Sequence, residues 1–405
     1  MSGRTQVGIV GAGPAGLVLA HLLRREGIDC VILENRSRQH CEERIRAGVL
    51  EYGTVQLLHE IGVGDRMQRH GLVHEGVELR IPARSHRIDF KVLTGKNITV
   101  YGQHEVVRDL VHSWLAGGGA LQFEVQDVAV EALDSKQPRI RYRSDAGEQT
   151  LHCDFIAGCD GFHGICRPSL PAGALTVFER AYPFAWLGIL AEAAPSSEEL
   201  IYAYHDRGFA LHSMRSPTLT RLYLQCTPDE DLAQWPDDRI WSELETRLAD
   251  GQPWHLQQGP ILQKAVTGMR SFVVEPMQYG RMFLAGDAAH IVPPTGAKGL
   301  NLAVADVLVL ARALRDFYHH GTSHELDHYS QSCLRRVWKV QRFSWWMTSM
   351  LHRHEGNPFD QRRQLAELDY LFGSLAASQT LAENYVGLPF DLEAATSNGF
   401  RPAVL

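Results

Sequence analysis

A glycine-rich hexapeptide near the start of the chain has the spacing of a dinucleotide-binding turn. Gly11, Gly13 and Gly16 fall in the order G-x-G-x-x-G, and Glu34 lies eighteen residues beyond Gly16. The first glycine permits a tight turn, the second lets a pyrophosphate approach the backbone, and the third allows a strand and a helix to pack closely. The Glu34 carboxylate is placed to bind ribose hydroxyls. The motif therefore predicts a dinucleotide site, with an ordinary glycine-rich turn as the alternative.

Two later motifs indicate which dinucleotide binds. Asp160 stands in Gly-Cys-Asp-Gly and Asp287 in Gly-Asp-Ala-Ala-His, each after an apolar, strand-like run. An aspartate at the carboxyl end of a strand can bind a ribitol hydroxyl, and backbone amides at Gly299, Leu300 and Asn301 can hold phosphate or flavin oxygens. An isolated Asp-Gly pair is usually only a turn, but the three motifs together predict FAD. The sequence has no second strand-linked G-x-G-x-x-G, so a nicotinamide nucleotide is expected to bind only transiently.

In this order the motifs resemble those of the single-component flavoprotein aromatic hydroxylases. The resemblance is specific for the 4-hydroxybenzoate hydroxylases within that group and runs from Thr5 to Pro389. It is carried by the segments Arg44–Glu51, Gly71–Gly76, Arg207–Leu211, Phe343–Ser349 and Asn384–Pro389. It implies an enzyme of aromatic catabolism that binds FAD, oxidises NADPH or NADH and consumes O2. A flavin hydroperoxide would hydroxylate 4-hydroxybenzoate ortho to its phenol, giving 3,4-dihydroxybenzoate.

The resemblance assigns five residues to substrate binding, of which Pro294 lies beside the reacting carbon and the other four contact the two ends of the substrate. Ser213, Arg215 and Tyr223 match a clamp for its carboxylate, and Tyr202 matches the partner of its phenol. A planar carboxylate suits a bidentate guanidinium aided by hydroxyl donors. The phenol has to ionise to become electron-rich, although its pKa is near ~10. A tyrosine hydroxyl can stabilise the anion and pass the proton onward.

The remaining assignments concern proton transfer and the flavin. Tyr385 and His74 match a proton relay, and histidine, which titrates near pH ~6.5, is a suitable exit to solvent. The backbone carbonyl of Pro294 matches a group beside the ring carbon that is hydroxylated. The flavin contacts match Arg44, Arg46, Gln103, Asp160, Arg221, Asp287, Gly299, Leu300 and Asn301.

Three questions stay open at the level of the sequence. The same chemistry on a related phenolic acid is one alternative, and a non-catalytic FAD-fold escort protein, which would lack the tyrosine–arginine pocket, is another. The preferred nucleotide is the third. Arg36 and Arg38 follow Glu34 and favour a contact with the 2′-phosphate of NADPH, whereas Glu42 and Glu43 would repel that group and favour NADH.

An α/β fold is needed to position these motifs. The predicted strands and β-rich runs are 6–10, 30–34, 71–100, 121–156, 182–225 and 281–285. The predicted helices are 14–26, 103–115, 300–318, 325–351 and 361–372. We expect a Rossmann-like βαβ domain that binds FAD, an inserted β-sheet substrate domain and a helical C-terminal region.

The expected domains are discontinuous. The FAD-binding domain is assigned to 1–72, 99–177 and 268–320, and the β-rich substrate domain to 73–98 and 178–267. A helical C-terminal region at 321–394 is expected to contribute a subunit interface, because a homodimer is expected, and 395–405 is assigned as a tail.

Composition narrows the partners. A chain of 405 residues with 44% hydrophobic and 21% charged residues can form a packed core. The net charge of -7 disfavours a nucleic-acid partner. Seven scattered cysteines without a Cys-x-x-Cys pair suit a reducing cytoplasm and neither a disulfide framework nor a zinc site. The sequence has no membrane-length apolar stretch, so a membrane partner is not expected.

Other conspicuous side chains are expected to be structural. An aromatic group at helical spacing is predicted to be core or subunit contact and comprises Trp338, Phe343, Trp345, Trp346 and Met347. Histidines at 319–320 and 352–354 are expected at solvated helix ends, because no carboxylate or cysteine falls at metal-ligand spacing nearby.

Overall fold

The computed structural model describes residues 2–44, 48–354 and 358–390. It opens with a βαβ unit in which β1 (Ser2–Val10) and β2 (Cys30–Leu33) are parallel and α1 (Pro14–Arg25) connects them. This confirms the predicted opening, and β1 begins before the predicted strand. Its apolar side chains explain the element, since Val7 and Ile9 are fully buried.

The first sheet has the order β17-β18-β11-β1-β2-β8, with β9 and β10 joined to β11. Its further strands are β8 (Ala120–Gln122), β9 (Gln126–Glu131), β10 (Arg139–Ser144), β11 (Gly147–Gly158), β17 (Gln278–Tyr279) and β18 (Met282–Leu284). β11 pairs in parallel with β1 on one side and with β18 on the other. The carboxyl ends of these three strands therefore lie at one edge of the sheet, although they are far apart in sequence.

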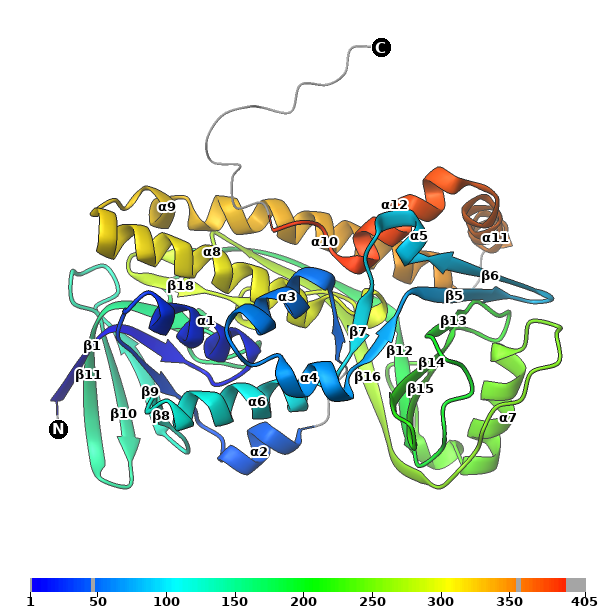
Figure 1. The fold of residues 1–405 in the computed structure, drawn as a ribbon, viewed down its shortest axis with the longest axis horizontal. Helices are drawn as coiled ribbons and strands as arrows, with labels where there is room; N and C mark the ends of the chain where they lie inside the picture. Colours follow the sequence, from blue (N-terminus) through cyan, green and yellow to red (C-terminus); the bar gives the residue numbers. More distant parts are fainter. Residues whose placement is uncertain (1, 45–47, 355–357, 391–405) are drawn as a thin grey trace, which may run out of the picture.

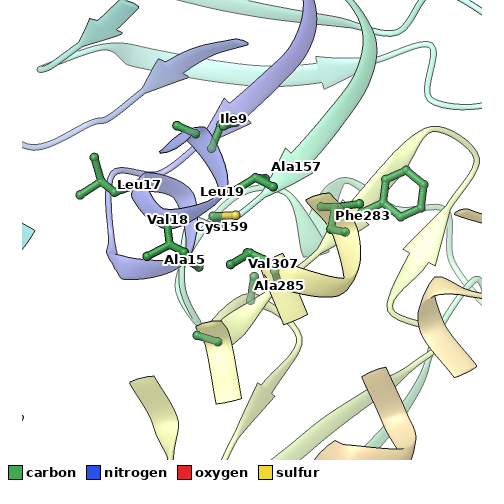
Figure 2. Packing of buried hydrophobic residues seen from close by; sticks show 14 of the residues in the cluster. Ile9, Ala15, Leu17, Val18, Leu19, Ala157, Cys159, Phe283, Ala285 and Val307 are labelled. Atoms are coloured by element: carbon green, nitrogen blue, oxygen red, sulfur yellow. The ribbon is translucent and has the colours of Figure 1, made fainter. Parts of the chain in front are cut away.

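α1 packs against two other helices at this sheet. α1 contacts both α6 (Gln103–Ala116) and the long helix α8 (Gly299–His320). Figure 2 shows Ile9 and Ala157 from the strands beside Leu17 and Val18 of α1, with Val307 of α8 close by. The buried apolar face of α8 thus fixes the start of that helix beside the strand ends.

The second sheet has the order β19-β16-β12-β15-β14-β13-β5-β6. Its strands are β5 (Gly76–Ile81), β6 (Arg84–Asp89), β12 (Thr176–Ala191), β13 (Ile201–Ala203), β14 (Ala210–Ser216), β15 (Leu219–Cys226), β16 (Ile261–Glu275) and β19 (His290–Ile291). β12 and β16 are continuous, so the predicted boundaries at 177/178 and 267/268 fall inside strands. A small third sheet joins β3 (Val49–Leu50), β7 (Ile98–Val100) and β4 (Leu72–His74).

The C-terminal region is helical, as predicted. It contains α9 (His324–Asp327), α10 (Tyr329–Leu351), α11 (Pro358–Gly373) and α12 (Leu375–Val386). The single helix predicted at 325–351 is wrong in one respect, because it is broken at His328. The His328 ring lies 2.8 Å from the His324 carbonyl and competes for the backbone there. In Figure 1, α8, α9 and α10 line one long side of the molecule, and α11 and α12 lie near β5 and β6.

Several short helices were not predicted. They are α2 (Arg38–Glu43), α3 (Tyr52–Glu60), α4 (Asp65–His70), α5 (Phe90–Thr94) and α7 (Asp237–Leu248), with single 3-10 turns η1 (Arg167–Ser169), η2 (Leu232–Gln234), η3 (Gly286–Ala288) and η4 (Pro294–Gly296). Within the described residues, no helix has the length and apolar character needed to cross a membrane. The predicted tail at 395–405 lies outside the described residues.

Candidate active site

The three predicted dinucleotide motifs converge in space. β1, β11 and β18 end beside one another, so the glycine-rich turn, the turn of Asp160 and the turn of Asp287 share one sheet edge. Backbone bonds from Cys159 to Val10 (2.8 Å) and from Ala285 to Gly158 (3.0 Å) tie the three turns together. This is the edge at which ligands bind in open α/β sheets.

The glycines of the first turn have different tasks. A Cβ on Gly11, which has φ 105°, would collide with the Cys159 carbonyl, and a Cβ on Gly16 would collide with the Gly11 carbonyl. A Cβ on Gly13 would meet no described heavy atom within 4 Å. Gly11 and Gly16 therefore serve packing, and Gly13 leaves open space at the N-terminus of α1. Since no side chain caps that helix end, its free amides fit a pyrophosphate.

Of the two predicted acids of this edge, Glu34 is buried and Asp160 is half-buried. Glu34 accepts hydrogen bonds from the amides of Ala12 (2.7 Å) and Arg36 (2.8 Å), which hold its carboxylate beneath the glycine-rich turn. Asp160 Oδ2 accepts from Cys166 N (2.8 Å), and its Oδ1 is buried without a hydrogen-bond partner among the residues described. Burial raises the pKa of Asp160. An unpaired buried carboxylate oxygen fits a hydroxyl donor such as that of a ribitol chain.

Asp306, which the sequence analysis missed, supports the turn of Asp287. Its Oδ2 accepts from Gly286 N (2.9 Å) and lies 2.6 Å from His290 Nε2. Although burial disfavours the imidazolium, the Asp306 carboxylate raises the pKa of His290. A charged residue on the apolar face of the helix predicted at 300–318 was the signal for this pair, because a buried charge needs a partner. Asp287 itself is half-buried in η3.

At the start of α8, backbone amides are available to a ligand, whereas the Asn301 side chain is engaged within the protein. The Asn301 amide donates to the carbonyls of Val49 (2.9 Å) and Ala297 (3.1 Å) and accepts from Glu51 N (2.9 Å). Its side chain thus ties β3 to α8. The contacts assigned to Gly299, Leu300 and Asn301 would then come from the first helical amides, which have no partner within a helix.

The other predicted flavin residues lie on separate elements. Gln103 begins α6, and Arg44 follows the end of α2. Arg46 lies outside the described residues. Arg221 on β15 extends over Gly188, where a Cβ would press on its guanidinium, and stacks 5.3 Å from the Tyr223 ring centre.

The predicted substrate residues share one face of the second sheet. Tyr202 on β13 pairs with Leu211 on β14, which pairs with Tyr223 on β15, so the three side chains point the same way. Ser213, two residues beyond Leu211, lies on that face as well. This face packs against α10 and α12, whereas the opposite face packs against α7. We call it the substrate face.

Arg215 lies beside Ser213 and Tyr223, the two residues predicted to form the carboxylate clamp with it. One guanidinium nitrogen donates to Ser213 Oγ (2.8 Å) and to the Met214 carbonyl (2.9 Å), and its Nε is buried without a partner in the described part of the chain. Burial lowers the pKa of Arg215, and the nearby Tyr223 opposes that shift. A guanidinium with an unused N–H on an apolar face fits a carboxylate ligand.

Tyr202 and Tyr385 form the predicted pair. Their hydroxyl oxygens are 2.7 Å apart, and both side chains are buried. Burial raises the pKa of each phenol. α12 supplies Tyr385, whose ring stacks on Phe90 at 5.0 Å. The two phenols come from elements far apart in sequence, which is why only the family resemblance indicated the pair.

A buried lysine beside Tyr385 was also missed. Lys298 Nζ donates to the Tyr385 carbonyl (2.7 Å) and to Glu51 Oε1 (2.8 Å). Burial lowers the pKa of Lys298, and the Glu51 carboxylate opposes that shift. Its position in the glycine-rich stretch 295–299, which leads into the flavin-binding helix, was the available signal.

His74 differs from its predicted setting. It is 1% exposed, and neither ring nitrogen has a hydrogen-bond partner within the described residues. Burial lowers the pKa of His74 to about 4, and the ring is not at the solvent-exposed position that the sequence analysis expected. The prediction of solvated helix ends is also wrong for His352, which is 0% exposed. His320 is exposed, as predicted.

Pro294, the predicted neighbour of the reacting carbon, begins the turn η4. Its carbonyl accepts from Ala297 N at 2.9 Å. The next residue, Thr295, is buried, and its hydroxyl lies 2.8 Å from that of Thr348 on α10. The turn is thereby fixed between the start of α8 and the helix that covers the substrate face.

The chain matches a known protein family and several named enzymes. The model of the FAD binding domain family matches residues 4–344. A p-hydroxybenzoate hydroxylase of Acinetobacter baylyi is 48% identical over 96% of this chain and 97% of its own length. A 6-hydroxy-3-succinoylpyridine 3-monooxygenase of Pseudomonas putida is 25% identical over 80% of this chain and 83% of its own length.

A solved structure shows the same fold at lower identity. The p-nitrophenol 4-monooxygenase of Pseudomonas putida superposes with a TM-score of 0.81 over 96% of this chain and 100% of its own, at 20% identity. The family match and the 48% identical relative extend over the motifs and the substrate face described above. The chain belongs to the p-hydroxybenzoate hydroxylase family of FAD-binding monooxygenases.

Proposed function

We propose that this enzyme hydroxylates 4-hydroxybenzoate ortho to its phenol, forming 3,4-dihydroxybenzoate with NAD(P)H and O2 as co-substrates. The observation that carries the proposal is the substrate face, where the Arg215 clamp and the Tyr202–Tyr385 pair lie on one side of adjacent strands. A molecule with a carboxylate at one end of an aromatic ring and a phenol at the other can contact both. The relative with 48% identity carries the corresponding name.

The protein side of the reaction follows from these contacts. Arg215, Ser213 and Tyr223 bind the carboxylate and orient the ring. Tyr202 donates to the phenolate oxygen and passes the substrate proton to Tyr385, because their hydroxyls are 2.7 Å apart. The turn at Gly13, the carboxylates of Glu34 and Asp160 and the start of α8 would hold FAD, which supplies reducing equivalents and an activated oxygen atom when bound.

The proton path beyond Tyr385 is proposed to include His74. Burial holds this imidazole neutral at working pH, and a neutral ring can accept a proton at one nitrogen while releasing one from the other. Because of the lowered pKa, little His74 is protonated near neutral pH. The ring would therefore pass a proton on and would not retain it. The two buried ring nitrogens of His74, which have no hydrogen-bond partner among the described residues, fit bridging water molecules along this path.

NADPH is the proposed reductant, with NADH as the alternative. Arg36 and Arg38 are exposed beside the FAD-binding carboxylate of Glu34, where they could contact the 2′-phosphate of a nicotinamide nucleotide that binds transiently at the surface. Arg38 is already engaged, since its Nε lies 2.6 Å from Glu42 Oε1. The exposed ion pair can open at little cost, so a modest preference for NADPH is expected. A cytoplasmic homodimer completes the proposal.

Turnover with defined substrates tests this function. Oxidation of NADH and of NADPH is measured with and without 4-hydroxybenzoate, and the product is identified chromatographically. Benzoate is the matched control, because it keeps the carboxylate and lacks the phenol. Dihydroxybenzoate formation dependent on 4-hydroxybenzoate supports the proposal. Nucleotide oxidation without a hydroxylated product, or better hydroxylation of another phenolic acid, contradicts it.

A further inference from the structure

His352 is a buried histidine to which no step above assigns a role. It follows the last residue of α10, and Trp186 Nε1 donates to its Nε2 at 2.7 Å. Its Nδ1 lies 2.9 Å from the Thr348 carbonyl. An indole N–H can only donate, so His352 Nε2 is the acceptor and Nδ1 carries the proton. The imidazole is therefore held neutral, in one tautomer and one orientation.

The same ring forms part of an aromatic cluster on the substrate face. It lies 4.7 Å from Phe184 and 4.4 Å from Phe209, with interplanar angles of 10° and 25°. Trp186, in turn, packs 4.7 Å from Tyr223, and Phe209 packs 6.1 Å from Tyr202. One residue of the carboxylate clamp and the phenol partner thus rest on two rings that both contact His352.

His352 is also linked, through Thr348, to the turn η4 that carries Pro294. The Thr348 carbonyl accepts a hydrogen bond from His352 Nδ1, and the Thr348 hydroxyl lies 2.8 Å from that of Thr295. Gln225 of β15 adds a further link between the second sheet and the residue that follows His352. Its Oε1 accepts from the backbone amides of Phe209 (3.0 Å) and Arg353 (2.9 Å), and its Nε2 donates to the Arg353 carbonyl (2.7 Å).

We propose that His352 is a positioning residue that fixes the substrate face relative to η4. The hydrogen bond from Trp186 holds the sheet, the bond to Thr348 holds α10, and Thr348 holds Thr295 beside Pro294. The aromatic ring of the substrate is thereby kept at one distance and angle from the reacting oxygen. This inference rests on the proposed function, because it concerns how efficiently reducing equivalents become product.

Two variants break the link from its two ends. His352→Phe keeps a flat ring in the stack and removes both side-chain hydrogen bonds, whereas Trp186→Phe keeps a ring and removes only the indole donor. In each variant the yield of dihydroxybenzoate per NAD(P)H consumed should fall by at least about twofold at saturating substrate, because small displacements strongly slow transfer between positioned groups. The yield of the double variant should fall no further than that of His352→Phe, since His352→Phe already removes the hydrogen bond that Trp186→Phe removes.

A histidine in a similar setting elsewhere serves as the control. His21 is 4% exposed, lies 3.0 Å from the Leu110 carbonyl and contacts the Trp114 ring edge-on, away from the substrate face. His21→Phe should lower the melting temperature and leave the product yield unchanged. Substrate affinity, measured by calorimetry, should change less than the yield in both His352→Phe and Trp186→Phe.

The outcomes are distinguishable. The positioning role is supported if the yield of dihydroxybenzoate per NAD(P)H falls (uncoupling) in His352→Phe and Trp186→Phe and stays at the wild-type value in His21→Phe. Full coupling in the two pocket variants, or equal uncoupling in His21→Phe, overturns it while the proposed function stands. If His352→Phe does not fold, Trp186→Phe alone decides between these results. A wild-type enzyme that forms no hydroxylated product overturns the proposed function and this inference with it.

Discussion

At the scale of single residues, the substrate face separates recognition from activation. In the proposed function, Arg215 and Ser213, which are hydrogen-bonded to each other, would contact one end of the substrate, and Tyr202, which pairs with Tyr385, would contact the other. Tyr202 on β13 and Ser213 on β14 lie on one face of two adjacent strands, and the Arg215 side chain joins them there through Ser213, so each group can be replaced separately. Two predictions follow from this separation of roles.

Removing the Tyr202 hydroxyl should abolish product formation and preserve binding. Tyr202→Phe keeps the Arg215 clamp, so the substrate dissociation constant should stay nearly unchanged. The phenol loses its hydrogen-bond partner and stays protonated, and a neutral phenol is a poor nucleophile. Nucleotide oxidation should continue and hydrogen peroxide should replace dihydroxybenzoate. Both products are measured together, and a well-coupled Tyr202→Phe would show that the activating group lies elsewhere.

Removing the Arg215 guanidinium should have the converse effect. Arg215→Ala should weaken substrate binding by about 2–5 kcal/mol, the usual cost of leaving a buried charge unpaired. Arg215→Lys should recover only part of this, because it loses the bidentate fork. Arg87→Ala, at an exposed arginine of β6 paired with Glu199, should bind as the wild type does. A dissociation constant for Arg215→Ala within about threefold of the wild-type value would exclude the clamp.

At the scale of secondary structure, the first βαβ unit was the most predictable element. Gly11, Gly13 and Gly16 must each be glycine for a local structural reason, and the spacing of the motif is enough to predict these reasons. The convergence of β11 and β18 on β1 was not derivable from residue patterns, because it depends on the pairing of strands far apart in sequence. The family resemblance supplied that information, and the same holds for the Tyr202–Tyr385 pair.

The flavin-binding turn can be tested through its glycines. Gly13→Val should fold and fail to retain FAD, because the new side chain would enter the open space at the start of α1. Gly268→Val is the matched control, since a Cβ there also meets no described atom within 4 Å but lies on β16. FAD content is read from visible absorbance after gel filtration. Retention of FAD by Gly13→Val would contradict the site.

Elements of low amphipathicity were missed for physical reasons. α2 buries no residue, and α5 has only Phe90 buried, so neither carries the apolar stripe that periodicity detects. His74 and His352 were misjudged for another reason. Sequence motifs give a residue's type and neighbours along the chain, but burial is decided by elements that pack on it from elsewhere, here the aromatic stack around His352.

At the scale of the whole molecule, buried histidines should make stability depend on pH. Burial lowers the pKa of His74 and of His212 to about 4 and that of His352 to about 3. The unfolded chain binds these protons near pH 6.5 and the folded chain only at lower pH. The free energy of unfolding should therefore fall as the pH drops below about 6.5, by up to about 1.4 kcal/mol per pH unit for each histidine.

His212 allows this linkage to be isolated, because Gln can replace its acceptor for Ser196 N (3.1 Å). Between pH 7 and pH 5, His212→Gln should lose about 2 kcal/mol less stability than the wild type. His320→Gln, at an exposed position, should lose as much as the wild type. Urea unfolding at saturating FAD gives the three values. Equal losses in all three proteins would show that His212 does not contribute to the linkage.

The most direct test of the account uses isotopically labelled O2. The wild-type enzyme, with FAD, NADPH and 4-hydroxybenzoate, is allowed to turn over under the labelled gas, and the aromatic product is analysed by mass spectrometry. We predict 3,4-dihydroxybenzoate with a single labelled oxygen in the new hydroxyl group and nearly one product molecule per NADPH. A product whose new oxygen comes from water, or NADPH oxidation that yields only labelled peroxide, would contradict the central claim.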